Sequence, residues 1–151
     1  MQSFEQPPFW AAKYIGIPFV DRGRTYDGCD CWGLVRLVML EQAGIELPSL
    51  ATSYGSEKDH AAVASEIEAQ KKHHHWSEVE LGEERAFDVV ELSIPIRVGK
   101  RWAFPSLHVG VLVCPNWLLH VERATASRLS SMNDSSIQSR IMGVWRHNPC
   151  S

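Results

Sequence analysis

One cysteine and two distant histidines are the residues of this chain whose types and spacing point most directly to chemistry. Cys31 follows Asp30 at the predicted start of a helix, and His108 and His120 lie on two successive predicted strands. A helix N-terminus favours a thiolate, because its unpaired amide hydrogens and its positive dipole end stabilise negative charge. A thiolate, an imidazole base and a polar group that orients the base together form the catalytic set of a cysteine hydrolase.

The helix that carries the cysteine has clear start and stop signals. Asp30 is a favourable N-cap residue, and Gly44 is a typical C-terminal stop. Gly33 in the first turn is expected to leave room for a substrate chain close to the backbone. The apolar face has the helical period of i, i+3, i+4 and i+7 and consists of Cys31, Leu34, Val35 and Val38.

Whether the two histidines meet depends on the turn between their strands. A two-residue loop at Pro115 and Asn116 would place them on opposite faces of the sheet. A three-residue loop that also includes Cys114 would pair Gly110 with His120 and make His108 a diagonal neighbour on the same face. The second register is the prediction, because it keeps one apolar set together on a core face from which His108 looks away. That set is Val109, Val111, Leu119 and Val121.

Structural and metal-binding roles are the alternatives for these residues. Cys31 could be a small buried residue under its helix, and a strand histidine is often only half-buried. Cys29 and Cys31 could bind zinc together with the two histidines, but a one-residue cysteine spacing is unlike the usual zinc knuckle. The triplet His73, His74 and His75 cannot point at one ion from a regular element, which favours a solvated linker. We therefore expect no metal and no cofactor.

Length, composition and charge limit the number of domains and the classes of partner that the chain can have. The chain has 151 residues, of which 44% are hydrophobic, and this length predicts a single domain over residues 1–151. A formal net charge of -3 with a pI near 6.1 argues against nucleic acid and anionic membranes as partners. No stretch approaches the roughly 18 to 20 apolar residues of a membrane span. The four cysteines show no disulfide framework, so reduced thiols are expected.

The elements around the site indicate an α+β fold, because helices come first and an antiparallel meander follows. An N-terminal helical segment is expected over 9–15, a loop over 21–28 and a surface helix over 57–72 that starts at Ser56 and Asp59. The predicted strands are 87–93, 107–114, 117–122 and 141–145. Residues 94–102 stay unassigned, as a long loop or irregular hairpin beside the site.

At these residues the sequence resembles the NlpC/P60 family of papain-like cysteine peptidases, and more narrowly its phage-associated branch. The matching stretches are 14–19 (YIGIPF), 28–36 (GCDCWGLVR), 44–48 (GIELP), 87–92 (FDVVEL), 108–113 (HVGVLV) and 118–121 (LLHV). The resemblance implies a papain-like fold in which N-terminal helices pack on a central antiparallel sheet. It also implies that Cys31 is the nucleophile, His108 the base and His120 the polar third residue.

By the same resemblance, Tyr14 and Asp30 would line the substrate side near the nucleophile. Trp32 stands where relatives commonly have serine, so it is expected at the substrate end of the groove, where it closes a subsite or stacks on a peptide. Packing of Trp32 against the Tyr14 segment is the alternative.

The activity that the resemblance implies is a cysteine endopeptidase that cuts cell-wall stem peptides, often between D-glutamate and a diamino acid. Residues 1–10 do not read as a secretory signal, so we expect synthesis in the cytoplasm without that export route. A phage tail would then carry the enzyme, which makes phage tail proteins expected partners. The alternatives are a tail-assembly protein with little hydrolysis and an injected amidase toxin.

Overall fold

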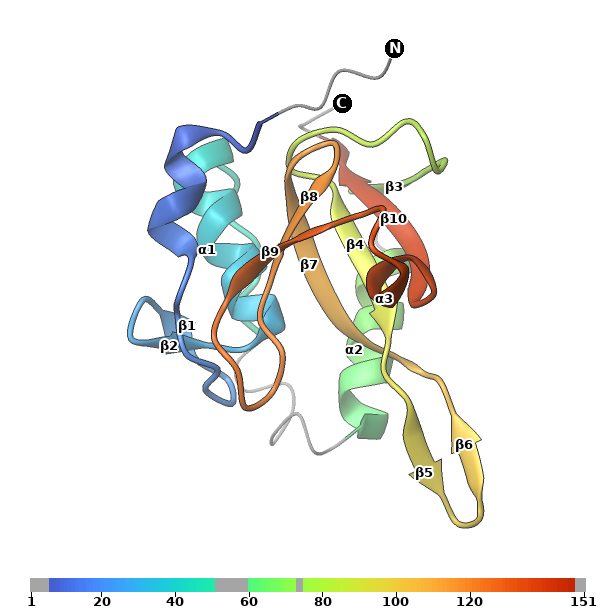
Figure 1. Ribbon diagram of the computed structural model, residues 1–151. Helices are drawn as coiled ribbons and strands as arrows, with labels where there is room; N and C mark the ends of the chain where they lie inside the picture. The colour runs from blue at the N-terminus through green and yellow to red at the C-terminus, as the bar shows by residue number, and fades with distance from the viewer. Residues whose placement is uncertain (1–5, 51–59, 73–74, 149–151) are drawn as a thin grey trace.

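The sheet at the centre of the molecule confirms the predicted α+β class. The computed structural model describes residues 6–50, 60–72 and 75–148 (Figure 1). Six antiparallel strands form the sheet, in the order β3-β10-β4-β7-β8-β9. Their bounds are β3 Trp76–Val79, β4 Val89–Ser93, β7 Ser106–Cys114, β8 Trp117–His120, β9 Arg128–Ser131 and β10 Ile141–His147.

The helix α1 begins and ends where the sequence predicts. It spans Cys31–Ala43, and the Asp30 carboxylate caps it by accepting a hydrogen bond of 2.8 Å from the Gly33 amide. Gly44 follows in the left-handed region at φ 69°, which a glycine adopts without strain. A short 3₁₀ helix, η1, covers Phe9–Tyr14, so the segment predicted as helical there is helical.

A small hairpin delivers the chain to Cys31. Its strands are β1 (Arg24–Thr25) and β2 (Gly28–Cys29), and all but Cys29 lie in the segment 21–28 that is predicted to be a loop. Both strands are only two residues long, which is below the length at which a periodic pattern can be recognised in a sequence.

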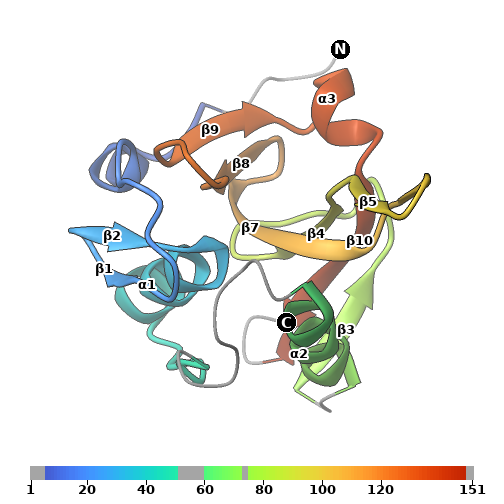
Figure 2. The same ribbon diagram turned by 90° about the horizontal axis from the view of Figure 1, so that it is seen from below.

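Apolar side chains cover both faces of the sheet. On one face, strand residues pack with α1, and Ile67 of α2 (His60–Lys72) lies against the same cluster. On the other face, Leu112 and Leu118 pack with Ile137 of α3 (Ser135–Gln138). Figure 2 shows α2 and α3 on opposite sides of the sheet. The expectation that His108 looks out of the core is wrong, because the side chain is fully buried.

Several elements differ from the prediction. Strand β4 starts at Val89 rather than at 87, because Phe87 has a φ of 73°, which interrupts an extended strand. β3, β9 and α3 are short and were not predicted. The unassigned segment 94–102 contains a regular hairpin of β5 (Ile96–Val98) and β6 (Arg101–Ala103).

Other predictions fall partly on residues that the structure does not describe. The expected helix start at Ser56 and Asp59 lies outside the described residues, and so do His73 and His74. No helix among the described residues is long and apolar enough to span a membrane.

Candidate active site

The two histidines that the sequence places on neighbouring strands lie side by side in the structure. Nε2 of His108 is 3.1 Å from Nδ1 of His120. Both side chains are fully buried. The strands pair Val111 with Leu119 and Leu112 with Leu118, and the same register sets Gly110 opposite His120. A methyl group at Gly110 would lie 3.0 Å from Cβ of His120, so a glycine there gives the second imidazole its space.

The turn between β7 and β8 differs from the predicted one, although the register at the histidines is the same. Cys114 pairs with Trp117, so the loop is the two-residue Pro115–Asn116 turn rather than the expected three-residue one. The register shifts between Leu112 and Cys114, which makes Val113 the extra residue of a bulge. The predicted register at the histidines is thus confirmed, while the predicted loop length is wrong.

The hydrogen bonds around the pair limit how the protons can be arranged. Nε2 of His120 lies 2.9 Å from Oγ of Ser130 on β9. Nδ1 of His108 is buried and has no hydrogen-bond partner among the described residues. If this nitrogen is to accept a proton, neutral His108 must carry its hydrogen on Nε2 and donate it to His120. Neutral His120 must then carry its own hydrogen on Nε2 and donate it to Ser130.

The surroundings of the pair keep both imidazoles neutral. Burial lowers the pKa of His108, and the neighbouring His120 lowers it further. Burial also lowers the pKa of His120, with a further contribution from the Arg128 charge. Both rings are therefore uncharged at neutral pH, and an uncharged imidazole is the form that can act as a general base.

A half-buried carboxylate lies beside the histidines. Oε1 of Glu122 is 3.9 Å from Nδ1 of His120 and 2.7 Å from Nη1 of Arg140. Burial would raise the pKa of Glu122, but the Arg140 hydrogen bond and the electrostatic effects of His108, Arg140 and His120 together outweigh burial, and the pKa is lowered. A carboxylate that stays ionised can stabilise positive charge that arises on the imidazole pair during a reaction.

Cys31 is the first residue of α1 and is buried, with an exposed fraction of 5%. α1 packs against β7 and β8, the two strands that carry His108 and His120. Its neighbour Cys29 is in a different state. Burial and the adjacent Asp30 raise the pKa of Cys29 to about 12, with a smaller opposing effect of Arg24. Cys29 is thus a protonated core thiol, whereas Cys31 lies at the helix N-terminus.

Asp30 and Gly33 have structural roles in the described part of the chain. Oδ1 of Asp30 accepts from the Gly33 amide and pairs with Nη1 of Arg24 at 2.7 Å, and the carboxylate is buried. A methyl group at Gly33 would lie 2.1 Å from the carbonyl oxygen of Gly23. The space that a glycine leaves here is therefore filled by the β1–β2 hairpin rather than by a substrate chain.

Trp32 is almost buried, with an exposed fraction of 9%. Its indole Nε1 donates a hydrogen bond of 2.8 Å to the carbonyl oxygen of Pro48. Both the ring and its polar atom are thus engaged by the protein itself, which favours a packing role.

The Tyr14 hydroxyl group makes its hydrogen bonds away from the cysteine. The Tyr14 hydroxyl donates to Glu41 at 2.7 Å and accepts from Gln42 at 3.0 Å. Both partners lie near the C-terminal end of α1, and the rise from Cys31 to Glu41 along a helix axis is roughly 15 Å. The hydroxyl group therefore lies at the end of the helix opposite the nucleophile.

The residues that could hold a metal are not those of the zinc alternative. Ligand atoms of His108, His120 and Glu122 lie within 4.8 Å of one another, and neither Cys29 nor Cys31 belongs to this group. The 3.1 Å separation of the two ring nitrogens is also within hydrogen-bonding distance, so the two neutral rings can share a hydrogen bond.

Ser130, Glu122 and Arg140 are the residues of this site that the sequence did not reveal. Ser130 lies on the unpredicted strand β9, and Arg140 lies just before β10. Glu122 follows the His120 strand by two residues, so its place near the site was the one signal available in the sequence.

Comparison with known proteins places these features in a family. Residues 16–146 match the model of the NlpC/P60 family. No curated protein matches the chain. A Staphylococcus aureus subsp. aureus Mu50 structure described as similar to lipoprotein, NLP/P60 family, has a TM-score of 0.57 and 23% identity and covers 91% of this chain. This chain corresponds to only 38% of that protein.

A second solved structure matches this chain over most of the length of both proteins. The NlpC/p60 domain of the peptidoglycan hydrolase SagA has a TM-score of 0.54 and 18% identity, and the match covers 89% of this chain and 90% of that domain. At these identities the two structures support the fold, which is the papain-like α+β fold expected from the sequence. Since the family model matches most of the chain, the protein belongs to the NlpC/P60 family.

Proposed function

We propose that this protein is a cysteine endopeptidase that hydrolyses peptide bonds in the stem peptides of peptidoglycan. Cys31 is the nucleophile, His108 the base and His120 the residue that orients the base. One observation carries the proposal most directly: the buried Nδ1 of His108 has no partner among the described residues, while His120 holds its Nε2. Membership of a family of cysteine hydrolases and the fold shared with a peptidoglycan hydrolase support the reaction class.

In the proposed mechanism, Nδ1 of His108 takes the proton of the Cys31 thiol. The resulting thiolate attacks the carbonyl carbon of the scissile amide, and the N-terminal end of α1 stabilises the negative charge that develops. The His108 imidazolium then gives its proton to the leaving amine, which departs and leaves a thioester on Cys31. Water attacks the thioester, His108 takes one of its protons and returns it to the sulfur, and the carboxylic acid is released.

His120 contributes by holding the base in one orientation. Its Nδ1 accepts from Nε2 of His108 in both the neutral and the protonated state of that ring. The ring of His120 stays neutral, because burial lowers its pKa, and can therefore continue to accept. The negative charge of Glu122 near the pair stabilises the imidazolium while it lasts.

The finer part of the proposal concerns the bond and the biological setting. The bond cleaved is the one between D-glutamate and the diamino acid of the stem peptide. The protein is made in the cytoplasm and acts as part of a phage tail, with tail proteins as partners. The similarity of the stretches around Cys31 and His108 to the phage-associated branch supports this setting.

Purified sacculi provide the test. The wild-type protein and Cys31→Ala are incubated with them, and the soluble fragments are identified by mass spectrometry. We expect fragments with a new diamino-acid amino terminus from the wild-type protein and none from the variant. No release by the folded wild-type protein would overturn the proposed hydrolase and favour the tail-assembly alternative. Release of fragments cut at another bond would overturn only the bond assignment.

A further inference from the structure

The hairpin β5–β6 projects from the body of the molecule (Figure 1). Its strands pair with each other, and Val98 pairs with Arg101 across a turn in which Gly99 has a φ of 63°. The hairpin continues directly from β4 and β7, because Ser93 pairs with Ser106 and the Ile94 amide donates to the Pro105 carbonyl oxygen. It therefore extends the same two strands of which one carries His108.

The base of the hairpin is fixed to the body of the protein. Ile94 and Ile96 are partly buried and pack in one cluster with Ala64 and Ile67 of α2. These contacts hold the hairpin in a defined direction. A side chain on the outer part of the hairpin is thus presented at a defined distance from the histidine pair.

The outer surface of the hairpin combines positive charge with exposed apolar side chains. Arg97, Lys100 and Arg101 lie on it, and no acidic residue occurs between Ser93 and Glu122, although the whole chain has a net charge of -3. Three large apolar side chains nearby are more than half exposed: Val98 at 58%, Trp102 at 57% and Phe104 at 61%. Exposed apolar residues that gather in one place commonly mark an interaction site.

The aromatic ring on this surface is held in place. Cζ of Arg97 lies 4.9 Å from the centroid of the Trp102 ring, a cation–π contact that favours one orientation of the indole. Such a rigid ring with cations around it suits a ligand that has both an apolar face and negative charge. Peptidoglycan has this chemistry, since its sugar rings present C–H faces and its stem peptides carry carboxylates at regular intervals.

From these observations we propose that the β5–β6 hairpin is an anchoring arm that binds the peptidoglycan polymer outside the cleavage site. The proposal rests on the proposed function, because it takes the polymer that the site cleaves as the ligand of the arm. His108 is the sixth residue after Trp102, and six steps of extended chain span roughly 20 Å. The arm therefore contacts a part of the polymer next to the cleaved peptide and keeps the enzyme on its insoluble substrate.

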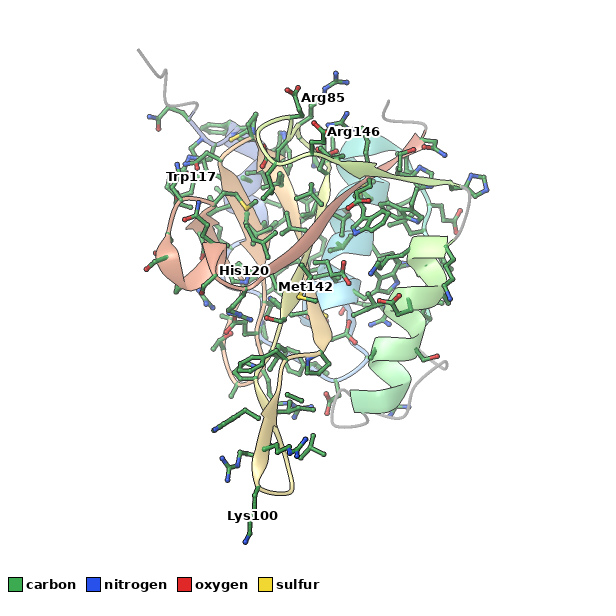
Figure 3. The ribbon with its side chains drawn as sticks, turned by 90° about the vertical axis from the view of Figure 1, so that its right-hand side faces the viewer. Arg85, Lys100, Trp117, His120, Met142 and Arg146 are labelled. Carbon is green, nitrogen blue, oxygen red and sulfur yellow. The ribbon has the colours of Figure 1, made fainter. Side chains whose placement is uncertain are left out.

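The test measures binding separately from hydrolysis. Every protein carries Cys31→Ala, so that no bond is cut, and its sedimentation with purified sacculi gives an apparent dissociation constant. Lys100→Ala/Arg101→Ala and Trp102→Ala alter the arm. The matched control is Lys72→Ala/Arg85→Ala, which removes two exposed cations elsewhere; Figure 3 shows Arg85 at the end of the molecule opposite Lys100.

We expect the charge variant of the arm to bind about fivefold more weakly, since an exposed ion pair is worth roughly a factor of two to five. Trp102→Ala is expected to weaken binding similarly, and the control is expected to bind like the parent protein. Sacculi whose carboxylates have been converted to amides should bind the parent protein as weakly as native sacculi bind the charge variant.

Equal binding of the parent and both arm variants would overturn the proposal. It would also be overturned if the arm variants lost binding to phosphatidylglycerol vesicles but kept binding to sacculi, since the arm would then recognise lipid. Hydrolysis by the protein with Cys31 intact is measured in parallel. If the arm variants bind more weakly but the protein with Cys31 intact does not hydrolyse sacculi, the proposed hydrolase is rejected and the anchoring arm is supported. If the protein hydrolyses sacculi but binding does not depend on the arm, the anchoring arm is rejected and the proposed hydrolase is supported.

Discussion

Nε2 of His108 lies 3.1 Å from Nδ1 of His120, and Nε2 of His120 lies 2.9 Å from Oγ of Ser130. Nδ1 of His108 has no hydrogen-bond partner among the described residues, and in the proposed mechanism it is the atom that exchanges a proton with the Cys31 thiol. The proposed function therefore gives the two histidines different roles, and substitutions at them should have different effects.

The first prediction compares substitutions at the two histidines. His108→Ala removes the titrating nitrogen and should lower kcat by about a thousandfold or more, the contribution expected of a general base. His120→Asn and His120→Gln keep a polar group beside His108, so they should retain more activity than His120→Ala. Initial rates on a soluble stem peptide, with circular dichroism as the folding control, provide the measurement. An equal loss in all variants would show that the two roles are misassigned.

The second prediction concerns Ser130, which the structure adds to the site. Ser130→Ala removes the acceptor that fixes the tautomer of His120 and should lower kcat about fivefold, since one hydrogen bond is worth about 1 kcal/mol. KM should change little, because the residue acts through His120 and does not bind substrate. Ser130→Thr keeps the hydroxyl group and should restore the rate.

Ser131→Ala is the matched control for Ser130, because Ser131 is the next residue on β9 and its hydroxyl donates to Asn116 instead. A loss of kcat in Ser131→Ala equal to that in Ser130→Ala would point to a general effect on the strand and against the positioning role.

The sequence predicts the parts of this site that follow from periodic patterns and capping signals. Asp30 and Gly44 correctly mark the start and the end of α1, and the alternation of apolar residues selects the register that places His108 beside His120. The contacts of Ser130 and Tyr14 depend on how separate elements pack, which no local pattern encodes. The Tyr14 hydroxyl donates to Glu41 near the C-terminal end of α1, although the family resemblance places Tyr14 near the nucleophile.

The turn between β7 and β8 shows why one correct prediction can contain an error. The apolar pattern fixes which residues must share a face, but two loop lengths are compatible with it when a bulge is allowed. Val113 is that bulge, so the register is conserved while the loop is shorter than expected.

The third prediction concerns the reactivity of the cysteines. At neutral pH a limiting amount of iodoacetamide should label Cys31 first. Cys29 should react little, because burial raises its pKa to about 12. Mapping the adduct by mass spectrometry gives the answer. The same experiment on His108→Ala should show slower labelling of Cys31, since the base is missing. Preferential labelling of Cys29 or Cys114 would contradict the assignment of the nucleophile.

The fourth prediction is a loss of stability in mild acid. Burial lowers the pKa of both His108 and His120 below the ordinary value of 6.5. Between the lowered values and 6.5 the unfolded chain binds more protons, so the free energy of unfolding falls as the pH falls. At about pH 5 each histidine should lower the free energy of unfolding by about 2 kcal/mol relative to about pH 8, since one pH unit corresponds to about 1.4 kcal/mol.

Urea unfolding at the two pH values measures this difference in stability. His120→Gln has one titrating group fewer and should show a smaller difference between about pH 8 and about pH 5. Glu122 does not obscure the comparison, because its lowered pKa puts its own effect on stability below pH 4.5. A wild-type protein that is equally stable at both pH values would contradict the neutral, buried state of the pair.

The last prediction decides between the two roles of Trp32. Its indole is nearly buried and donates to the Pro48 carbonyl oxygen, so Trp32→Ser should lower stability by roughly 3–5 kcal/mol, the usual range for truncating a large core side chain. Trp32→Phe keeps most of the packing and loses the hydrogen bond, and should lose about 1 kcal/mol. The stem peptides that are cleaved should be the same for all three proteins at a temperature where each is folded. A wider product range for Trp32→Ser, together with a stability close to that of the wild type, would instead show that the indole closes a subsite.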